Sequence, residues 1–276
     1  MREITAKTAL LGIFGDPVGH SLSPVMHNGW LDDYGIDAVF VALPLKSADA
    51  KAAFTALKGL GLKGASVTVP HKEAAAAAAD RSEAPAANVL RWEADGTVSA
   101  FNTDGAGFLA ALTEAAPAWR ESVKQILILG AGGAAIGIAA MLSGVAPMRI
   151  ANRTLARAET LAAQFRDARA AAWDELPNLF ANADLVVHTT TMGMGANPSP
   201  DWPVARCKPG AIVVDIVYRP LETPLLKAAR ARGLVAVDGL GMLIHQGVLA
   251  FELWFGVRPD PAAARRRMMH ALGEAP

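Results

Sequence analysis

The sequence of 276 residues has one cysteine, Cys207, no excess of either charge, and no long hydrophobic run. A single thiol excludes a disulfide within the chain. Because 26 basic side chains balance 26 acidic ones, nothing in the charge favours a nucleic acid partner. No apolar run approaches the ~20 residues that a membrane-spanning helix needs. Since residues 1–7 also lack the apolar core of a secretion signal, we expect a soluble cytoplasmic protein without a nucleic acid or membrane partner.

Metal ligands are scarce as well. The six histidines include no close pair and there are no paired cysteines, so we expect no metal site. What the chain has in quantity is hydrophobic residues, at 52%, which can fill a large core. Its length predicts two domains that share a cleft.

Short apolar runs alternate with helical stretches in both halves of the chain, which predicts the α/β class. The first half reads as strands at 11–15, 39–43 and 65–69 with helices at 24–34 and 48–60. The second half has apolar runs at 125–129, 148–151, 184–187, 211–214 and 234–237. Continuous apolar strands are typical of parallel sheets covered on both faces. We expect an amino-terminal α/β domain followed by a doubly wound parallel sheet of the Rossmann type.

The domain boundaries follow from two helical segments. Residues 104–116 read as a helix that leads from the first half to the second. Residues 239–255 are too long and too helical for another strand, and we expect them to pack on the first half together with a helix at 261–272. One domain is therefore predicted to comprise 1–103 completed by 240–276, and the other 104–239.

Polar side chains follow the third predicted strand. A strand that buries Val67 and Val69 would hold Thr68 and Lys72 at its carboxyl end, where open α/β sheets place their ligands. The alternative is that Lys72 is a solvated surface lysine.

A glycine-rich segment, Gly-Ala-Gly-Gly-Ala-Ala, follows the strand at 125–129 and opens a helix. This is the context of a dinucleotide fingerprint, in which the backbone approaches a pyrophosphate at a helix amino terminus. A tight turn without a ligand is the alternative. The residues expected to contact a cofactor are Gly130, Ala131, Gly132, Gly133 and Ala134.

The next strand ends without the acid that usually holds the ribose hydroxyls of NAD. In its place stand Asn152, Arg153 and Thr154, with Arg157 one helical turn on. Guanidinium, amide and hydroxyl donors suit a phosphate, so NADP is the predicted cofactor. The alternative is that Arg157 is an ordinary exposed helix residue.

Two hydroxyls, Ser21 and Ser23, stand directly before or within the start of the first predicted helix. Ser23 could cap this helix, and capping hydroxyls with unpaired N–H groups also form a carboxylate receptor. Gln246 on the helix at 239–255 could close a pocket, or it could be an amide at the edge of the core.

Nine motifs in order along nearly the whole chain resemble the shikimate dehydrogenase family. They are Gly-His-Ser-Leu-Ser-Pro (19–24), Val-Thr-Val-Pro-His-Lys (67–72), Ala-Asn-Val-Leu (87–90), Phe-Asn-Thr-Asp-Gly (101–105), Gly-Ala-Gly-Gly-Ala (130–134), Ala-Asn-Arg-Thr (151–154), Asp-Ile-Val-Tyr-Arg-Pro (215–220), Thr-Pro-Leu-Leu (223–226) and Gly-Met-Leu-Ile-His-Gln-Gly (241–247).

The resemblance implies NADP-dependent reversible reduction of 3-dehydroshikimate to shikimate, with the substrate on the first domain and the cofactor on the second. It implies that Lys72 and Asp104 are a catalytic pair sharing the substrate hydroxyl. Ser21 and Ser23 would hold the substrate carboxylate. The remaining implied contacts are Thr68, Asn88, Tyr218 and Gln246 for the substrate, and the backbone of Ile216 and Gly239 for the nicotinamide.

The chain departs from the family pattern at Ser66, where asparagine is usual, and at 188–191, where His-Thr-Thr-Thr replaces Asn-Ala-Thr-Ser. The segment from Lys72 to Asn88 is also shorter than usual. A relative acting on quinate or another cyclohexane carboxylate therefore stays open, as does a sensor that binds without catalysis. We expect His188 to be a hydrogen-bonded structural residue rather than a second acid or base, and the protein to be a monomer or homodimer.

Overall fold

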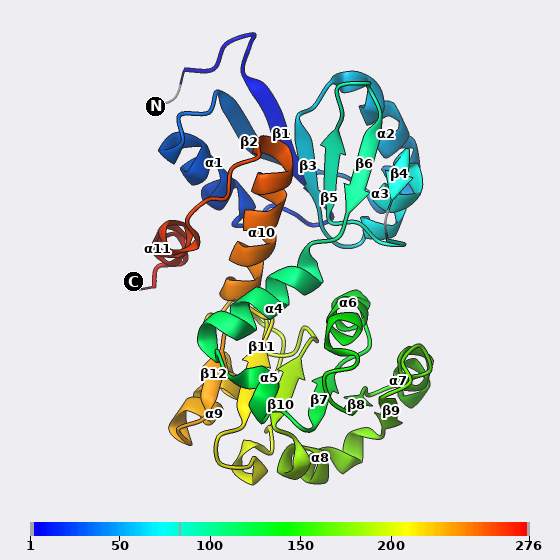
Figure 1. Ribbon diagram of the computed structural model, residues 1–276, viewed down its shortest axis with the longest axis vertical. Helices are drawn as coiled ribbons and strands as arrows, with labels where there is room; N and C mark the ends of the chain where they lie inside the picture. Colours follow the sequence, from blue (N-terminus) through cyan, green and yellow to red (C-terminus); the bar gives the residue numbers. More distant parts are fainter. Residues whose placement is uncertain (1–2, 83, 275–276) are drawn as a thin grey trace. The chain divides into compact units, whose positions relative to one another are not determined.

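A computed structural model describes residues 3–82 and 84–274, and the chain forms two compact units (Figure 1). Unit 1 comprises Met1–Thr103 and Gln246–Pro276, and unit 2 comprises Asp104–His245. Residues 240–245, which the sequence analysis assigns to the first domain, group with unit 2. The boundary thus falls inside the helix α10 (Gly239–Phe255) rather than before it.

Unit 1 is built on a six-stranded mixed sheet in the order β2-β1-β3-β5-β6-β4. The strands are β1 (Ala9–Gly15), β2 (Ala38–Pro44), β3 (Gly64–Val67), β4 (Arg81–Ser82), β5 (Val89–Trp92) and β6 (Val98–Phe101). Strands β1 to β3 are parallel, in agreement with the predicted alternation of strands and helices. Strand β5 runs antiparallel to both β3 and β6. This hairpin departs from the parallel sheet that we expected.

Helices cover both faces of this sheet. They are α1 (Ser23–Asp33), α2 (Ala50–Leu57), α3 (Lys72–Ala78), the end of α10 and α11 (Pro261–Leu272), with the 3-10 turns η1 (Ser47–Asp49) and η2 (Lys58–Leu60). On one face Phe14 and Val67 share a core with Phe54 of α2. On the other, Trp254 of α10 lies so close to Gly64 that a Cβ there would be 2.1 Å from the indole Nε1. Glycine at this position lets the helix approach the strand.

The free edge of β2 is partly covered by a side chain of α1. The Asn28 amide donates to the carbonyl of Phe40 at 2.7 Å and accepts from its N–H at 3.0 Å. The same amide donates to the carbonyl of Pro24 at 2.9 Å. One carboxamide therefore satisfies both backbone groups of Phe40 at the edge of the sheet.

Unit 2 is a parallel sheet in the order β12-β11-β10-β7-β8-β9, which is the doubly wound Rossmann order. The strands are β7 (Ile126–Leu129), β8 (Met148–Ala151), β9 (Ala168–Ala171), β10 (Leu185–His188), β11 (Ile212–Asp215) and β12 (Val235–Val237). The five predicted strands are present, and β9 is an edge strand that the sequence analysis missed. The predicted α/β fold class is confirmed.

Successive residues of β7 enter two cores. Ile126 and Ile128 pack with α4 (Asp104–Ala115), α6 (Gly133–Leu142) and α7 (Leu155–Ala162). Leu127 and Leu129 pack on the other face with α8 (Leu176–Asn182) and α9 (Pro224–Ala231). The short elements α5 (Trp119–Ser122), η3 (Trp173–Glu175) and η4 (Val204–Arg206) complete the unit. Burial on both faces explains why these strands read as continuous apolar runs.

In the part of the chain that the structure describes, helices with the length and hydrophobicity of a membrane span are absent. Residues 1–2 of the amino-terminal segment, for which no secretion signal is predicted, lie outside the described residues.

Candidate functional site

Three polar side chains of unit 1 form a buried cluster beside the start of β5 and the end of β6. The Asn88 Nδ2 donates to Gln246 Oε1 at 3.1 Å and to Thr103 Oγ1 at 3.0 Å, and Asn88 Oδ1 accepts from the Thr103 N–H at 2.7 Å. Thr103 Oγ1 also donates to the carbonyl of Gln246 at 3.1 Å. The structure thus joins two predicted substrate residues that are 158 positions apart. The sequence analysis missed Thr103, although it lies in the Phe-Asn-Thr-Asp motif beside Asp104.

Thr68 and Lys72 stand where the chain leaves β3. The strand ends at Val67, Thr68 is half-buried, and Lys72 begins α3 with a half-buried side chain. The Lys72 carbonyl accepts from the N–H of Ala87, directly before Asn88, at 2.9 Å. The prediction that Val69 is buried is wrong: it lies in the turn beyond the strand and is 65% exposed.

Ser21 and Ser23 meet at the start of α1. Ser23 is the first residue of the helix and is buried, whereas the capping position belongs to Leu22. The suggested role of Ser23 as a helix cap is therefore wrong. The Ser21 hydroxyl instead accepts from the N–H of Ser23 at 3.2 Å. The two serines are neighbours in space, as a shared carboxylate receptor requires.

In unit 2 the glycine-rich turn joins β7 to α6. Gly130 has a φ of +117°, and a Cβ there would lie 2.5 Å from Thr189 Oγ1, so only glycine fits. Gly132 occupies the capping position of α6 without a side-chain hydrogen bond to the helix. A Cβ on Gly132 or Gly133 would meet no atom within 4 Å. Gly132 and Gly133 are exposed, so the start of α6 is open to solvent, which fits an anion such as a pyrophosphate at the helix amino terminus.

The donors after β8 are exposed. Asn152 Nδ2 donates to the carbonyl of Thr154 at 2.9 Å, which holds the turn that leads into α7. Arg153 and Arg157 are both exposed, and within residues 3–82 and 84–274 neither guanidinium has a hydrogen-bond or ion-pair partner. Two uncompensated positive charges at the carboxyl end of β8 fit the 2′-phosphate of NADP.

The predicted nicotinamide wall lies past β11 and β12. Gly239 begins α10, and a Cβ there would lie 2.1 Å from the carbonyl oxygen of Ile216, so glycine is needed for this contact. Tyr218 is half-buried, and burial raises the pKa of its hydroxyl. The structure therefore places Ile216 and Gly239 against each other, with Tyr218 two residues further on.

The two predicted catalytic residues belong to different units. Lys72 begins α3 in unit 1, and Asp104 begins α4 in unit 2 with a half-buried side chain. Their pairing stays a prediction. The described residues contain no group of three or more His, Cys, Asp or Glu side chains that could hold a metal ion.

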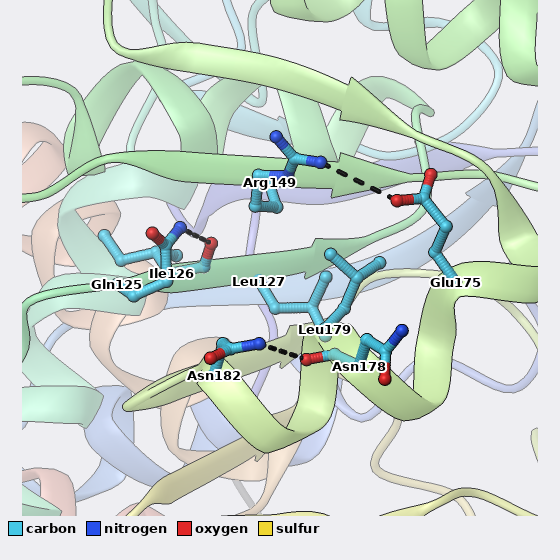
Figure 2. A pocket seen from close by; sticks show the side chains of 8 residues that line it. All are labelled: Gln125, Ile126, Leu127, Arg149, Glu175, Asn178, Leu179 and Asn182. Atoms are coloured by element: carbon cyan, nitrogen blue, oxygen red, sulfur yellow. Dashed lines mark hydrogen bonds and ion pairs between the residues drawn. The ribbon is translucent and has the colours of Figure 1, made fainter.

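A cavity of about 290 Å³ opens in unit 2 beside the first residues of β7 and β8 (Figure 2). It is lined by Gln125, Ile126, Leu127, Arg149, Glu175, Asn178, Leu179 and Asn182. Its polar groups largely pair with one another: Arg149 lies 3.8 Å from Glu175, and Asn182 donates to the Asn178 carbonyl at 2.7 Å. Doubly wound sheets bind ligands at the opposite, carboxyl ends of their strands, so this cavity is not the candidate site.

A doubly wound sheet with an open glycine turn after its first strand defines unit 2 as a dinucleotide-binding domain of the Rossmann class. Comparison with known proteins narrows this class to one family. Residues 13–90 match the family description "Shikimate dehydrogenase substrate binding domain", residues 114–197 match "Shikimate / quinate 5-dehydrogenase", and residues 239–269 match "Shikimate 5'-dehydrogenase C-terminal domain".

Individual relatives are similar to this chain over nearly its whole length. A Rhodospirillum rubrum protein named shikimate dehydrogenase (NADP(+)) is 44% identical over 95% of this chain and 97% of its own. A shikimate dehydrogenase solved with NADP+ is 34% identical, with a TM-score of 0.90 over 98% of each chain. A quinate dehydrogenase from Corynebacterium glutamicum solved with NAD is 31% identical, with a TM-score of 0.87 over 95% of this chain and 99% of its own. The chain belongs to the shikimate dehydrogenase family.

Proposed function

We propose that this protein catalyses the NADP-dependent, reversible reduction of 3-dehydroshikimate to shikimate. Unit 1 binds the substrate and unit 2 the cofactor. The observation that carries the proposal is the pair of exposed guanidinium groups of Arg153 and Arg157 after β8, which have no partner among the described residues. In a family whose members use NADP or NAD, this position selects for the additional phosphate.

The cofactor site combines the open start of α6 with the basic turn after β8. The turn from Gly130 to Ala134 receives the pyrophosphate, because its exposed glycines leave room for it beside the helix N–H groups. Asn152, Arg153, Thr154 and Arg157 receive the ribose phosphate. The backbone at Ile216 and Gly239 lies against the nicotinamide.

The substrate site uses the polar end of unit 1. Ser21 and Ser23 hold the carboxylate, and the ring hydroxyls bond to Thr68, to the Asn88 and Gln246 amides, and to Tyr218 from unit 2. Because Asn88, Thr103 and Gln246 already bond to one another, their donors and acceptors are fixed before substrate arrives. A fixed polar cluster costs little reorganisation on binding.

Bound NADPH supplies a hydride to the carbonyl carbon of the ring. The Lys72 ammonium hydrogen-bonds the carbonyl oxygen, stabilises the negative charge that builds on it and delivers the proton that completes the alcohol. The Asp104 carboxylate orients the hydroxyl and the ammonium. In the reverse direction Lys72 accepts the proton of the shikimate hydroxyl.

The test is reduction of NADP+ and of NAD+ by the purified protein with shikimate and, separately, quinate, followed by nicotinamide absorbance. We expect shikimate with NADP+ to be preferred. Replacing Arg153 and Arg157 by alanine should raise the KM for NADP+ roughly 30-fold or more and leave that for NAD+ unchanged, since two guanidinium–phosphate contacts are lost and each is worth about 1 kcal/mol or more. Equal effects on both cofactors would refute the role of this pair.

Lys72→Ala tests the chemistry in the same assay. It should lower turnover by about 10²–10⁴-fold with a much smaller change in shikimate KM, as expected for loss of an acid–base group. Near-normal turnover would contradict the assignment of Lys72.

Quinate oxidation is the second candidate, favoured by the similarity to a quinate dehydrogenase and by Ser66 at a position where the family usually has asparagine. A preference for quinate with NAD+ would replace the first proposal by this one. Stabilisation of the protein by NADP+ and shikimate without any absorbance change would instead indicate a sensor that binds without turnover. For the remaining properties we propose a cytoplasmic monomer or homodimer with no nucleic acid partner.

A further inference from the structure

A fully buried histidine lies next to the proposed cofactor site, at the carboxyl end of β10. The His188 Nδ1 lies 2.9 Å from Asp215 Oδ1 at the end of β11. The same Asp215 oxygen accepts from the N–H of Val217 at 3.0 Å, and Oδ2 accepts from the Thr223 hydroxyl at 2.7 Å. Thr223 in turn caps α9 by accepting from the N–H of Leu226 at 3.3 Å. His188 is therefore bonded to the Asp215 carboxylate, which holds the segment that follows β11 through Val217 and Thr223.

The other ring nitrogen, Nε2, bonds to the segment that follows β10. His188 Nε2 lies 2.5 Å from Thr190 Oγ1, which also accepts from the N–H of Met192 at 3.2 Å. Because the Asp215 carboxylate only accepts, Nδ1 carries a proton. With Nε2 as acceptor, the Thr190 hydroxyl donates to it and keeps its own oxygen for Met192. Every donor in this chain of bonds then has an acceptor.

The segment held by Thr190 lies against the glycine turn. The Thr189 hydroxyl donates to the carbonyl of Leu129 at 2.8 Å, at the end of β7. A Cβ on Gly130 would lie 2.5 Å from Thr189 Oγ1 and 2.9 Å from Thr190 Cγ2. Strands β7 and β10 are neighbours at the point where the strand order reverses, which is where doubly wound sheets bind their cofactors.

The segment held by Asp215 lies against the start of α10. The N–H of Ile216 donates to the carbonyl of His188 at 3.1 Å, and the N–H of Gly239 donates to the carbonyl of Val217 at 3.3 Å. One imidazole thus connects two segments, 189–192 and 216–218, that follow adjacent strands. Both are next to residues that the proposed function places at the cofactor.

We propose that His188 is a positioning residue that couples these two segments and so fixes the cofactor-facing end of the unit 2 sheet. The proposal rests on the proposed function for its statement that the ligand is NADP. His188 itself does not react: its side chain is fully buried, both ring nitrogens are engaged, and its ring packs edge-on against Trp202 at 5.0 Å. The structure thus bears out the expectation that His188 is a hydrogen-bonded structural residue.

The experiment separates the two hydrogen bonds of the ring. His188→Asn removes only the bond between Nε2 and Thr190, because its amide nitrogen reaches the position of Nδ1 and keeps the bond to Asp215. Thr190→Val removes that bond from the other side, together with the acceptor of the Met192 N–H. His188→Phe removes both hydrogen bonds of the ring. Thr113→Val is the matched control, since it deletes a hydroxyl that accepts from the Trp119 indole at 3.0 Å on α4, away from both segments.

Two readouts apply to each variant: backbone hydrogen exchange of the unliganded protein, and the Kd for NADP+ from calorimetry. His188→Asn should speed exchange in 189–192 only and raise the Kd for NADP+ about fivefold, as expected for one lost hydrogen bond. Thr190→Val should speed exchange in the same segment and raise the Kd at least as much, because it also removes the acceptor of the Met192 N–H. Since both variants break the bond between Nε2 and Thr190, the double variant should be no weaker than Thr190→Val alone. His188→Phe should speed exchange in both 189–192 and 216–218.

The coupling is refuted if His188→Phe changes exchange in one segment only, or if Thr190→Val and His188→Asn bind NADP+ as Thr113→Val does. If His188→Phe does not fold, the other two variants decide the question. Failure of the wild-type protein to bind NADP+ would refute the proposed function, whereas the exchange data would still test the coupling between the two segments.

Discussion

Of the three buried histidines among the described residues, His27 in unit 1 and His188 in unit 2 have opposite surroundings. His27 of unit 1 is 1% exposed, stacks on Phe40 with ring centroids 4.4 Å apart, and has no hydrogen-bond partner at either ring nitrogen among the described residues. Its other neighbours are aromatic as well, with the Trp254 and Trp30 rings at 5.2 and 5.4 Å. His188 of unit 2 is equally buried, yet both of its nitrogens are bonded.

The contrast shows two ways of burying polar groups. Around His27 only burial acts, and it lowers the pKa of the imidazole to about 3, because the charged form cannot be solvated. Unit 1 also leaves the buried Ser66 hydroxyl without a hydrogen-bond partner among its described residues. In unit 2 the Asp215 carboxylate accepts three hydrogen bonds. We therefore expect unit 1 to be sensitive to acid and unit 2 to the loss of a partner.

The largest effect should come from Asp215→Ala. It leaves the Nδ1–H of His188, the N–H of Val217 and the Thr223 hydroxyl buried without an acceptor, and should lower the free energy of unfolding by about 3–5 kcal/mol. Denaturant unfolding at pH 7.5 measures it. Asp215→Asn is the control, because it keeps two oxygen lone-pair positions and should cost less. A loss below about 1 kcal/mol for the alanine variant would mean that the network adds little.

A smaller effect is the acid sensitivity of unit 1. The pKa of His27 is about 3 in the folded protein, against the ordinary histidine value of 6.5 in the unfolded chain, so below pH 6.5 the unfolded chain binds a proton that the folded chain does not. Stability should therefore be fully present above pH 6.5 and should fall as pH decreases towards 3. One pKa unit is worth about 1.4 kcal/mol, so roughly 2 kcal/mol is lost by pH 5.

His27→Phe isolates this contribution, since it keeps an aromatic ring on Phe40 and cannot titrate. The difference in unfolding free energy between wild type and variant should grow by roughly 2 kcal/mol in favour of the variant between pH 7.5 and pH 5. His27→Leu serves as a second variant in case the larger ring strains the core. If the unfolding free energies of wild type and both variants changed in parallel over this pH range, protonation of His27 would not destabilise the folded protein, which would contradict the prediction.

The smallest effect should come from Ser66→Ala. Ser66 is 5% exposed and its hydroxyl has no hydrogen-bond partner in the described part of the chain, so deleting the hydroxyl should leave stability unchanged or raise it by up to about 1 kcal/mol. Ser99→Ala is the comparison, because Ser99 is equally buried and hydrogen-bonds the Glu93 carboxylate. Thermal unfolding of both variants measures the difference. A clear loss of stability for Ser66→Ala would reveal a partner of this hydroxyl.

Much of unit 2 could be predicted from its sequence. Strand β7 is apolar at every position, and β10 and β11 are apolar up to their last residues, His188 and Asp215, because both faces of the sheet are covered. The glycine turn directly follows β7. Strand β9 was missed because Ala-Arg-Ala-Ala has neither an apolar run nor β-branched residues. The partners of His188 were also beyond prediction, since Asp215 is 27 positions away and only the pairing of β10 with β11 brings them together.

Unit 1 was predicted less completely. Strands β5 and β6 were not predicted, because each has only four residues and residues 93–97 between them resemble any polar loop. Val69 has the apolar character of a strand residue, but Pro70 follows and the chain has already turned. Asn88 and Gln246 were proposed singly from family motifs. Only the packing of α10 on the sheet explains why they share a hydrogen bond.

The Asn28 amide has a consequence for how copies of this protein meet. An outer strand with unpaired backbone groups is a template on which another chain can add a strand, and such growth leads to aggregation. Here one carboxamide occupies both backbone groups of Phe40 in the middle of β2. A strand from a second molecule would have to displace it before pairing along that border. The Asn28 side chain thus disfavours self-association through this strand.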